Sequence, residues 1–282
     1  MPSLTTTSTP HPQLADDRII EICLRGERLY GDDFTPEQIA RWYVDEQEGY
    51  ANLGAKDEKS YRYYYHAMNR LHGYRHLPER RFARALGVGS AYGDEFEPIA
   101  PRVDHFTILE PSQQMRRESV FGKPAQWVPP KPSGDMPFDS NTFDLITCFA
   151  VLHHVPNVTH VVGEIGRVLA PGGFALIHEP VTSMGDWRQA RGGLTMHERG
   201  IPPAILDAAV DRAGLRIVRR AMHTFRPWTV LAARMGLEVY NVDWCTRVDA
   251  LLSQLFLWNT VYHPTRLRHR FRPVCVYYVL TK

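Results

Sequence analysis

Residues 81–282 predict an α/β fold with a mostly parallel sheet of seven strands and helices on both faces. Short apolar runs of strand length alternate there with stretches of helical spacing, a pattern typical of parallel strands joined by helices. The run TFDLITCFAV at 142–151 is almost continuously apolar, as expected for a strand that is buried on both faces.

Seven runs have the length and apolar content of strands, and helical spacing fills much of the chain between them. The predicted strands are 81–88, 104–110, 125–128, 142–151, 174–179, 215–225 and 273–282. The predicted helices are 35–50, 58–73, 112–119, 157–170, 201–215 and parts of 228–270.

Two of these helices carry start or stop signals. In TPEQ, Thr35 is predicted to cap the helix, Pro36 suits the first helical position, and Gln38 stands three residues after the cap. Asn157 is predicted to cap the next long helix of the sheet region, and the Pro-Gly-Gly at 171–173 is predicted to end it.

The helical segments outside the alternating region predict a core with two additions. We expect a disordered start at 1–17, a helical cap at 18–78, a core at 79–227 and 271–282, and a helical lid at 228–270. An insertion of this length between two strands is commonly a lid or a substrate wall. One predicted helical face in the insertion is formed by Val248, Leu251, Leu252, Leu255 and Trp258.

The composition excludes several classes of partner. The chain has 282 residues, 33 basic and 31 acidic, so its net charge of +2 gives no bulk reason to expect nucleic acid. The basic cluster RLRHRFR at 266–272 is interpreted as a solvated face or the rim of a site. The four cysteines contain no CxxC pair, which predicts neither disulfides nor a metal site. No secretory leader and no apolar run of about 20 residues is present, so we expect a cytoplasmic protein without a membrane partner.

The stretch ARALGVGSAYGDE at 83–95 predicts a strand that enters a glycine-rich loop. Glycines at 87, 89 and 93 let the backbone bend sharply and approach a ligand. Glu110 ends the next strand, 23 residues after Gly87, where an acid can accept both hydroxyls of a ribose. These features alone leave a nicotinamide site and other nucleotide sites open.

Four motifs in order narrow this choice: LGVGSAYG, ILEPS, DMPFDSNTFDLITCFAVLHHVPNV and EIGRVLAPGGFALIHEP. Together they resemble the class I S-adenosylmethionine-dependent methyltransferases, in particular the type 11-like group that acts on small molecules. The resemblance covers about 100 residues, 83–180. It implies a Rossmann-like fold, methyltransferase activity and S-adenosyl-L-methionine as the cofactor, but it does not specify the acceptor.

The resemblance also implies roles for particular residues. The loop at Gly87, Val88, Gly89 and Ser90 matches the one that packs against the methionine part of the cofactor, and Glu110 matches the acid that binds the ribose. The other implied cofactor residues are Pro111 and Ser112 beside that acid, Asp135 and Met136 at the adenine, and Phe149 and Ala150 along the methionine moiety.

Two positions depart from the family pattern. Family members usually carry an acid two residues before the first glycine, where Ala85 stands here. We expect Asp94 or Glu95 to offset this loss. Ala91 occupies the usual place of the third glycine, so the loop is a variant.

Methyl transfer to a hydroxyl needs close positioning of the oxygen and a base that takes its proton. His153 and His154 follow the fourth strand, and histidine titrates near neutral pH; the alternative is that this LHH only packs within the fold. His197, on a long polar loop, is also predicted as a base, and Glu179 is predicted to touch the acceptor. The alternative for that loop is a solvated linker.

We therefore expect a methyltransferase that O-methylates a small hydroxylated acceptor, such as a sugar or another intermediate of natural product biosynthesis. The helical additions carry aromatic residues that suit the walls of such a site: Trp42, Tyr43, Tyr61, Tyr64, Trp244 and Trp258. One alternative is an acceptor that is carrier-bound or lipid-like, and another is a catalytically silent binding module with the same fold. The expected partners are the small-molecule acceptor and, in a homodimer, a second copy of the chain.

Overall fold

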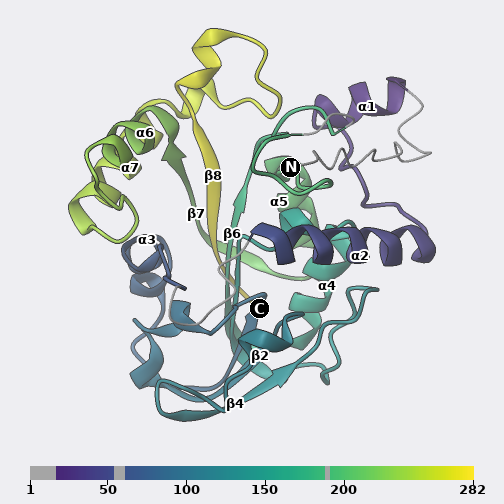
Figure 1. Cartoon of the computed structure of the whole chain (residues 1–282). Helices are drawn as coiled ribbons and strands as arrows, with labels where there is room; N and C mark the ends of the chain where they lie inside the picture. The colour runs from purple at the N-terminus through teal and green to yellow at the C-terminus, as the bar shows by residue number, and fades with distance from the viewer. Residues whose placement is uncertain (1–16, 54–60, 188–190) are drawn as a thin grey trace, which may run out of the picture.

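An eight-stranded sheet runs through the middle of the protein (Figure 1). It is seen in a computed structural model that describes residues 17–53, 61–187 and 191–282. The strand order is β3-β4-β2-β1-β5-β6-β8-β7. The strands are β1 (Phe82–Val88), β2 (Val103–Leu109), β3 (Ser119–Val120), β4 (Lys123–Val128), β5 (Phe143–Phe149), β6 (Leu169–Pro180), β7 (Arg216–Phe225) and β8 (Pro273–Thr281).

The sheet is mostly parallel, which confirms the predicted fold class. Strands β4, β2, β1, β5 and β6 pair in parallel, and β8 pairs antiparallel with both β6 and β7. The eighth strand, absent from the prediction, is the two-residue β3, which pairs antiparallel with β4. Phe121 and Gly122 connect these two strands with φ angles of 48° and 72°, as a tight hairpin turn requires.

Helices cover both faces of the sheet (Figure 1). Helices α4 (Val158–Val168) and α5 (Pro203–Arg212) lie on one face. Helices α3 (His66–His72), α6 (Arg226–Arg234) and α7 (Asp243–Leu255) lie on the other. Two further helices, α1 (Asp17–Leu24) and α2 (Pro36–Leu53), precede the first strand. No helix among these described residues is both long and apolar enough to cross a bilayer.

Helix α2 begins as the sequence predicts. The Thr35 amide donates to Gln38 Oε1 at 2.7 Å, and the Gln38 amide donates to Thr35 Oγ1 at 3.4 Å, so both free amides are satisfied. Further along, the Trp42 indole donates to the carbonyl of His154 at 2.7 Å. This contact ties α2 to the loop that follows β5.

Asn157 stands at the predicted N-cap position of α4, but the predicted capping bond is wrong. Its side chain makes no bond to the helix amides, and its Nδ2 donates to the carbonyl of Ser133 at 2.8 Å. The cap comes instead from Asp32, whose Oδ1 accepts from the Thr159 amide at 2.8 Å and whose Oδ2 accepts from the Thr159 hydroxyl at 2.6 Å. A residue more than 100 positions away therefore satisfies the helix end, which local sequence could not reveal.

The helix predicted at 58–73 is wrong over 61–65, which is not helical; residues 58–60 lie outside the described residues. Only α3 is helical there, from His66 onward. The carbonyl of Tyr240 accepts from the amides of Ala67 and Met68 at 2.7 and 3.1 Å, and so fixes the helix start. Asn69 Nδ2 also donates to the hydroxyl of Tyr63 at 2.6 Å, which holds the preceding segment against α3.

The helix predicted at 112–119 is also wrong. Only the 3-10 turn Gln113–Met115 is helical, since Ser119–Val120 turns back to pair with β4. At the other end, Glu110 binds the Ser112 amide and fixes the start of the segment. Of the predicted disordered start, residues 1–16 lie outside the described residues, and Asp17 already belongs to α1.

Candidate functional site

A cavity of about 550 Å³ lies where β1, β2 and β5 end. Register pairs Val88 with both Leu109 and Cys148, so the loops after these three strands leave the same edge of the sheet. Ligands of open α/β sheets bind at this edge. The cavity is lined by Trp42, Tyr43, Glu46, Val88, Gly89, Tyr92, Leu109, Glu110, Pro111, Ser112, Gln113, Gln114, Met115, Pro130, Lys131, Pro132, Gly134, Asp135, Met136, Ala150, Val151, His154, Val155, Pro156 and Val161.

The loop after β1 requires glycine at two positions. A Cβ on Gly87 would stand 2.2 Å from Ser90 Oγ, and a Cβ on Gly89 would stand 2.6 Å from a methyl of Val151. Gly89 also has a φ of +61°, a backbone conformation that residues with a side chain rarely adopt. The two glycines therefore allow the loop to fold tightly against the chain that follows β5, as the sequence predicts for a ligand-binding turn.

Glu110 presents a fixed, buried carboxylate to the cavity. Its Oε2 accepts from the Ala91 amide and its Oε1 from the Ser112 amide, both at 3.0 Å. Burial raises the pKa of Glu110, and these two amides oppose the shift by stabilising the charged form. Each oxygen keeps acceptor capacity for a ligand hydroxyl.

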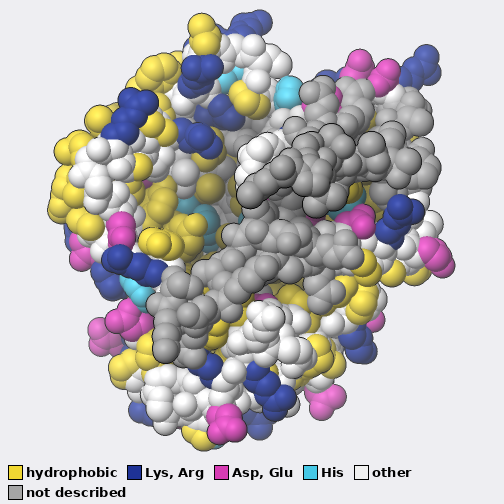
Figure 2. Space-filling model, in the orientation of Figure 1, with side chains coloured by type: hydrophobic (Ala, Val, Ile, Leu, Met, Phe, Trp, Pro, Cys, Tyr) yellow, Lys and Arg dark blue, Asp and Glu magenta, His cyan; other side chains and the backbone are white. Residues whose placement is uncertain are grey.

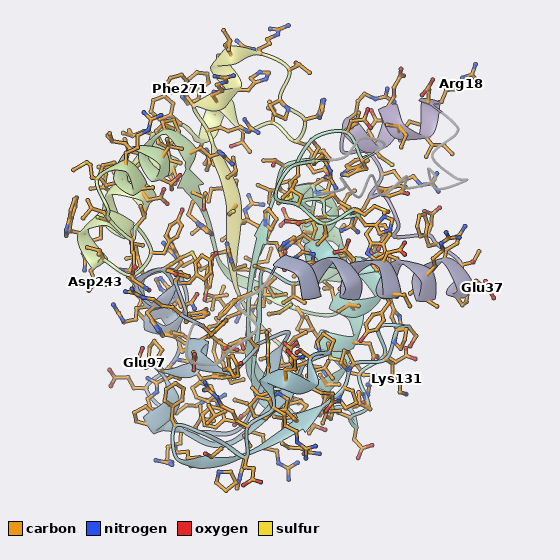
Figure 3. The ribbon with its side chains drawn as sticks, in the orientation of Figure 1. Arg18, Glu37, Glu97, Lys131, Asp243 and Phe271 are labelled. Carbon is orange, nitrogen blue, oxygen red and sulfur yellow. The ribbon has the colours of Figure 1, made fainter. Side chains whose placement is uncertain are left out.

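The segment between β4 and β5 supplies another wall. The amide of Met136 donates to Glu164 on α4 at 2.8 Å, and Asp135 Oδ1 lies 2.8 Å from Nε2 of His160. Both Asp135 and Met136 line the cavity, as does Lys131, labelled in Figure 3 on the same segment. The segment is thus held by α4 where the sequence places the adenine contacts.

Neither acid proposed to replace the one missing at Ala85 lines the cavity. Asp94 pairs with Arg117 at 3.2 Å. Glu95 is buried beneath the loop, where the hydroxyl of Thr147 donates to it at 3.3 Å. Burial raises the pKa of Glu95 to about 8. Both acids support the loop and its surroundings from outside the cavity.

Two buried charges of opposite sign hold the loop after β5. The Glu179 carboxylate accepts from the amides of 151–153 at 2.9, 2.7 and 3.2 Å. The Arg199 guanidinium donates to the carbonyls of Leu152, His153, Val155 and Pro156 at 2.9–3.4 Å, and to the carbonyl of Tyr30 at 2.8 Å. Glu179 therefore binds the amides of the loop that carries both histidines, and Arg199 binds its carbonyls.

His154 and Glu46 form a pair that lines the cavity. His154 Nδ1 lies 2.9 Å from Glu46 Oε2. The same carboxylate accepts from the Thr195 hydroxyl at 2.7 Å and the His197 amide at 3.0 Å. Burial lowers the pKa of His154, but the hydrogen bond and charge of Glu46 outweigh it, so the pKa is raised.

His153 is buried beside this pair. Its Nδ1 lies 2.8 Å from Glu179 Oε2, and its Nε2 lies 3.6 Å from Glu198 Oε1. Burial and the neighbouring His154 lower the pKa of His153 despite the two carboxylates. One ring nitrogen from each histidine and an oxygen of Glu198 lie within 4.8 Å of one another, a set of residue types that can bind zinc. The sequence predicted no metal, because no spacing pattern connects these residues.

The structure brings most predicted site residues to one cavity, but not all. Val88, Gly89, Glu110, Pro111, Ser112, Asp135, Met136, Ala150 and His154 line it, whereas Gly87, Ser90, Phe149, His153, Glu179 and His197 do not. The ring of Phe149 lies 5.5 Å from that of Tyr277. His197 stacks on Trp42 at 4.4 Å, and its Nε2 contacts Asp45 at 2.9 Å.

Glu46 lines the cavity and pairs with His154, and the sequence analysis missed it. It lies in the charged stretch DEQE at 45–48, which reads as a solvated helix face. The neighbouring Trp42 and Tyr43, predicted as aromatic walls, do line the cavity. Their position, three and four residues before Glu46, is the only local signal that this face of α2 turns inward.

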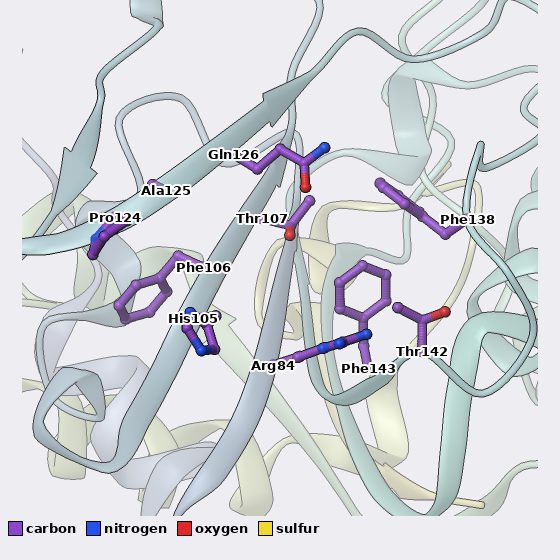
Figure 4. A pocket seen from close by; sticks show the side chains of 10 residues that line it. All are labelled: Arg84, His105, Phe106, Thr107, Pro124, Ala125, Gln126, Phe138, Thr142 and Phe143. Atoms are coloured by element: carbon purple, nitrogen blue, oxygen red, sulfur yellow. The ribbon is translucent and has the colours of Figure 1, made fainter.

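A second cavity of about 550 Å³ lies away from these loops (Figure 4). It is lined by Arg84, by three residues of β2, by three of β4 and by Phe138, Thr142 and Phe143; those of the two strands are His105, Phe106, Thr107, Pro124, Ala125 and Gln126. The residues of the glycine loop at 87–90, Glu110, His153, His154 and His197 do not line it. We assign it no part in the chemistry.

Known proteins resemble part of this chain in sequence. Residues 86–177 match the Methyltransf_11 family, described as a methyltransferase domain. A "Sterol methyltransferase-like 2" of Botryococcus braunii is 45% identical over 49 residues, and a "Sterol 24-C-methyltransferase erg6" of Schizosaccharomyces pombe is 46% identical over 48. Each alignment spans 17% of this chain and 13% of the relative.

The similarity in fold extends further. An S-adenosylmethionine-dependent methyltransferase from Mesorhizobium loti superposes with a TM-score of 0.51 at 15% identity, over 73% of this chain and 94% of that one. Residues 86–177 therefore form a methyltransferase domain that implies S-adenosylmethionine as the cofactor, and the solved structure shares the fold of the surrounding core.

Proposed function

We propose that this protein transfers a methyl group from S-adenosylmethionine to a hydroxyl oxygen of a small acceptor, a sugar or a natural product intermediate. One observation carries the proposal. A single cavity is lined both by Glu110, at the position where the family binds ribose, and by the His154–Glu46 pair, which can accept a proton.

The cofactor would lie along the ends of β1, β2 and β5. Glu110 would accept the ribose hydroxyls, Asp135 and Met136 would border the adenine, and the 87–90 loop with Ala150 would border the methionine moiety. When bound, the cofactor supplies a methyl carbon that is activated by the sulfonium. These residues fit such a ligand, because glycine lets the backbone approach closely and the Glu110 carboxylate keeps acceptor capacity.

His154 is the proposed general base. The cofactor would supply the methyl carbon and its sulfur would leave with S-adenosylhomocysteine, while His154 Nε2 would take the proton of the acceptor hydroxyl. Glu46 holds Nδ1 and so fixes the tautomer that leaves Nε2 able to accept the proton. The products are the methyl ether, S-adenosylhomocysteine and a proton released from the protein.

The other predicted catalytic residues take positioning roles in this proposal. Glu179 is fully buried and its oxygens are occupied by three amides and by His153. His197 is buried against Trp42. We propose that these contacts orient the loop and α2 around the cavity and that neither side chain touches the acceptor.

Two alternatives keep specific support. Ala85, which replaces the usual acid, favours a binding module without activity. The short matches to sterol methyltransferases and the largely apolar lining favour a lipid-like acceptor. The His154–Glu46 pair beside the expected cofactor residues favours the enzyme over the silent module, because methylation of a hydroxyl requires such a base.

The test is a turnover assay with matched acceptors. Purified protein and S-adenosylmethionine are incubated with hydroxylated sugars and aromatic compounds and, in parallel, with the analogue of each that lacks the hydroxyl. We expect a methylated product by mass spectrometry only from the hydroxylated member of a pair, with equal release of S-adenosylhomocysteine. Methylation of both members at the same rate would contradict O-methylation, and cofactor binding without turnover on any acceptor would favour the silent module.

A further inference from the structure

Helix α7 turns its apolar face outward. The residues that it buries are Cys245, Thr246, Asp249 and Ser253. Asp249 accepts from the amides of Thr224 and Phe225 at 2.9 and 2.8 Å, so the polar face is the one docked on β7. The outer face is formed by Trp244, Arg247, Leu251 and Leu255, at the spacing of one helical stripe. A surface helix normally has the opposite arrangement.

The neighbouring segments continue this apolar surface. Among the described residues, 16 large apolar side chains are exposed, and ten of them lie within 230–271. Leu251 is 62% exposed, Trp258 74% and Leu267 75%. The others are Val230, Leu231, Met235, Trp244, Leu255, Leu257 and Phe271. Such a concentration exceeds the isolated apolar residues found on ordinary surfaces.

Ring contacts join several of these residues in two groups. Trp228 of α6 meets Trp244 of α7 at 6.0 Å, and Phe256 lies 6.5 Å from Trp258 and 6.4 Å from Phe271. Figure 2 shows hydrophobic side chains gathered along the left edge, over α6 and α7, with Lys and Arg side chains between them. In Figure 3, Asp243 and Phe271 lie on this side of the molecule and Lys131 lies on the other.

The segment is also basic. Residues 226–272 contain seven arginines and three acidic residues, a net charge of +4 within a chain of net charge +2. One of the three acids, Asp249, is buried on the docked face. Four of the arginines form the cluster at 266–272, whose role as a solvated face or a rim the sequence left open.

We propose that this surface docks on an anionic lipid bilayer, with its tryptophans and leucines at the acyl boundary and its arginines at the headgroups. Tryptophan, leucine and arginine in this combination are typical of interfacial helices. In a dimer formed through this surface, the arginines of one copy would face those of the other, and the repulsion between like charges would oppose this contact. The apolar side chains protrude, which suits a deformable lipid interface better than a rigid protein surface.

The proposal does not rest on methyltransferase activity. It concerns the outer surface of α6, α7 and 256–271, none of which lines either described cavity. It also differs from a membrane span, which the described helices cannot form. The expectation of no membrane partner came from the lack of a spanning segment, and surface docking needs none.

The test is co-sedimentation with vesicles, without cofactor or acceptor. We expect the protein to pellet with phosphatidylcholine vesicles that contain about 30% phosphatidylglycerol at about 0.1 M salt, and not with pure phosphatidylcholine. A double variant, Leu251→Glu with Trp258→Glu, should bind these vesicles at least about tenfold more weakly than the wild type. The pair Arg268→Gln and Arg270→Gln should weaken it about 30-fold, since each arginine near an anionic surface contributes about fivefold.

The matched control is Phe121→Glu, an exposed apolar residue at the opposite edge of the sheet, which should bind as the wild type does. Circular dichroism checks that each variant is folded, and all substitutions lie at exposed positions. The proposal is overturned if the wild type does not pellet with anionic vesicles, or if neither double variant binds them more weakly than the wild type. A dimer that dissociates in Leu251→Glu without any vesicle binding would likewise overturn it and identify a self-interface.

Discussion

Replacing His154 by glutamine is expected to lower kcat about 100-fold to 10,000-fold, the usual contribution of a general base. Cofactor affinity should change little, because the residues that would bind the adenine, ribose and methionine parts are separate from this side chain. Steady-state kinetics and calorimetry with S-adenosylmethionine measure the two effects. His105→Gln, an exposed residue outside this cavity, is the control and should keep wild-type rates.

The pH profile tests the same residue independently. His154 must be neutral to accept a proton, and Glu46 raises its pKa, so kcat/KM should fall as the pH drops through a value above 6.5. Glu46→Gln removes the charge that raises the pKa and leaves the burial that lowers it, so this acid limb should move to lower pH. If the acid limb of the kcat/KM profile lies at the same pH in Glu46→Gln as in the wild type, His154 is not the group that titrates.

Replacing Arg199 by methionine is expected to destabilise the protein strongly. The side chain is fully buried and donates to five carbonyls, so methionine would remove five hydrogen bonds. The carbonyls of Leu152, His153 and Pro156 would each keep a bond from a backbone amide, whereas those of Tyr30 and Val155 would lose their donor. Uncompensated buried polar groups of this kind cost about 3–5 kcal/mol in the free energy of unfolding. For a chain of this length that corresponds to a drop of about 10 °C in Tm.

Thermal unfolding by calorimetry measures this change. Arg212→Met is the matched control, because Arg212 is exposed and makes one long contact of 3.5 Å with Thr159. Its Tm should stay within about 1–2 °C of the wild type. If Arg199→Met unfolds at the same temperature as this control, Arg199 does not hold the loop after β5.

Much of the core could be predicted from the sequence because its signals are local. The run at 142–151 is almost continuously apolar, and β5 is a central strand between β1 and β6 in a sheet with helices on both faces. Val158, Val161, Val162 and Ile165 recur in the sequence at helical spacing, and they form the buried face of α4. Glu110 and the glycines were found for the same reason, since their positions relative to strand ends are visible along the chain.

The parts that failed depend on distant contacts. Asp32 replaces Asn157 as a cap, and Tyr240 determines where α3 begins. Glu46 and Arg199 stand in polar stretches typical of solvent-exposed chain, and only tertiary packing buries them. The apolar stripe around Leu251 resembled a core-facing face, but Asp249 and Thr246 occupy the docked side of α7 instead.

The most direct test of the central claim, that the cavity beside Glu110 binds the cofactor, is calorimetric titration with S-adenosylmethionine and with S-adenosylhomocysteine. We predict micromolar binding of both by the wild type. Glu110→Ala should bind at least about 100-fold more weakly, since it loses two charge-assisted hydrogen bonds to the ribose. Glu97→Ala, an exposed acid that pairs with His66 at 3.0 Å, should bind like the wild type. Folded wild-type protein that binds neither compound, or Glu110→Ala that binds both as tightly as the wild type, would contradict the claim.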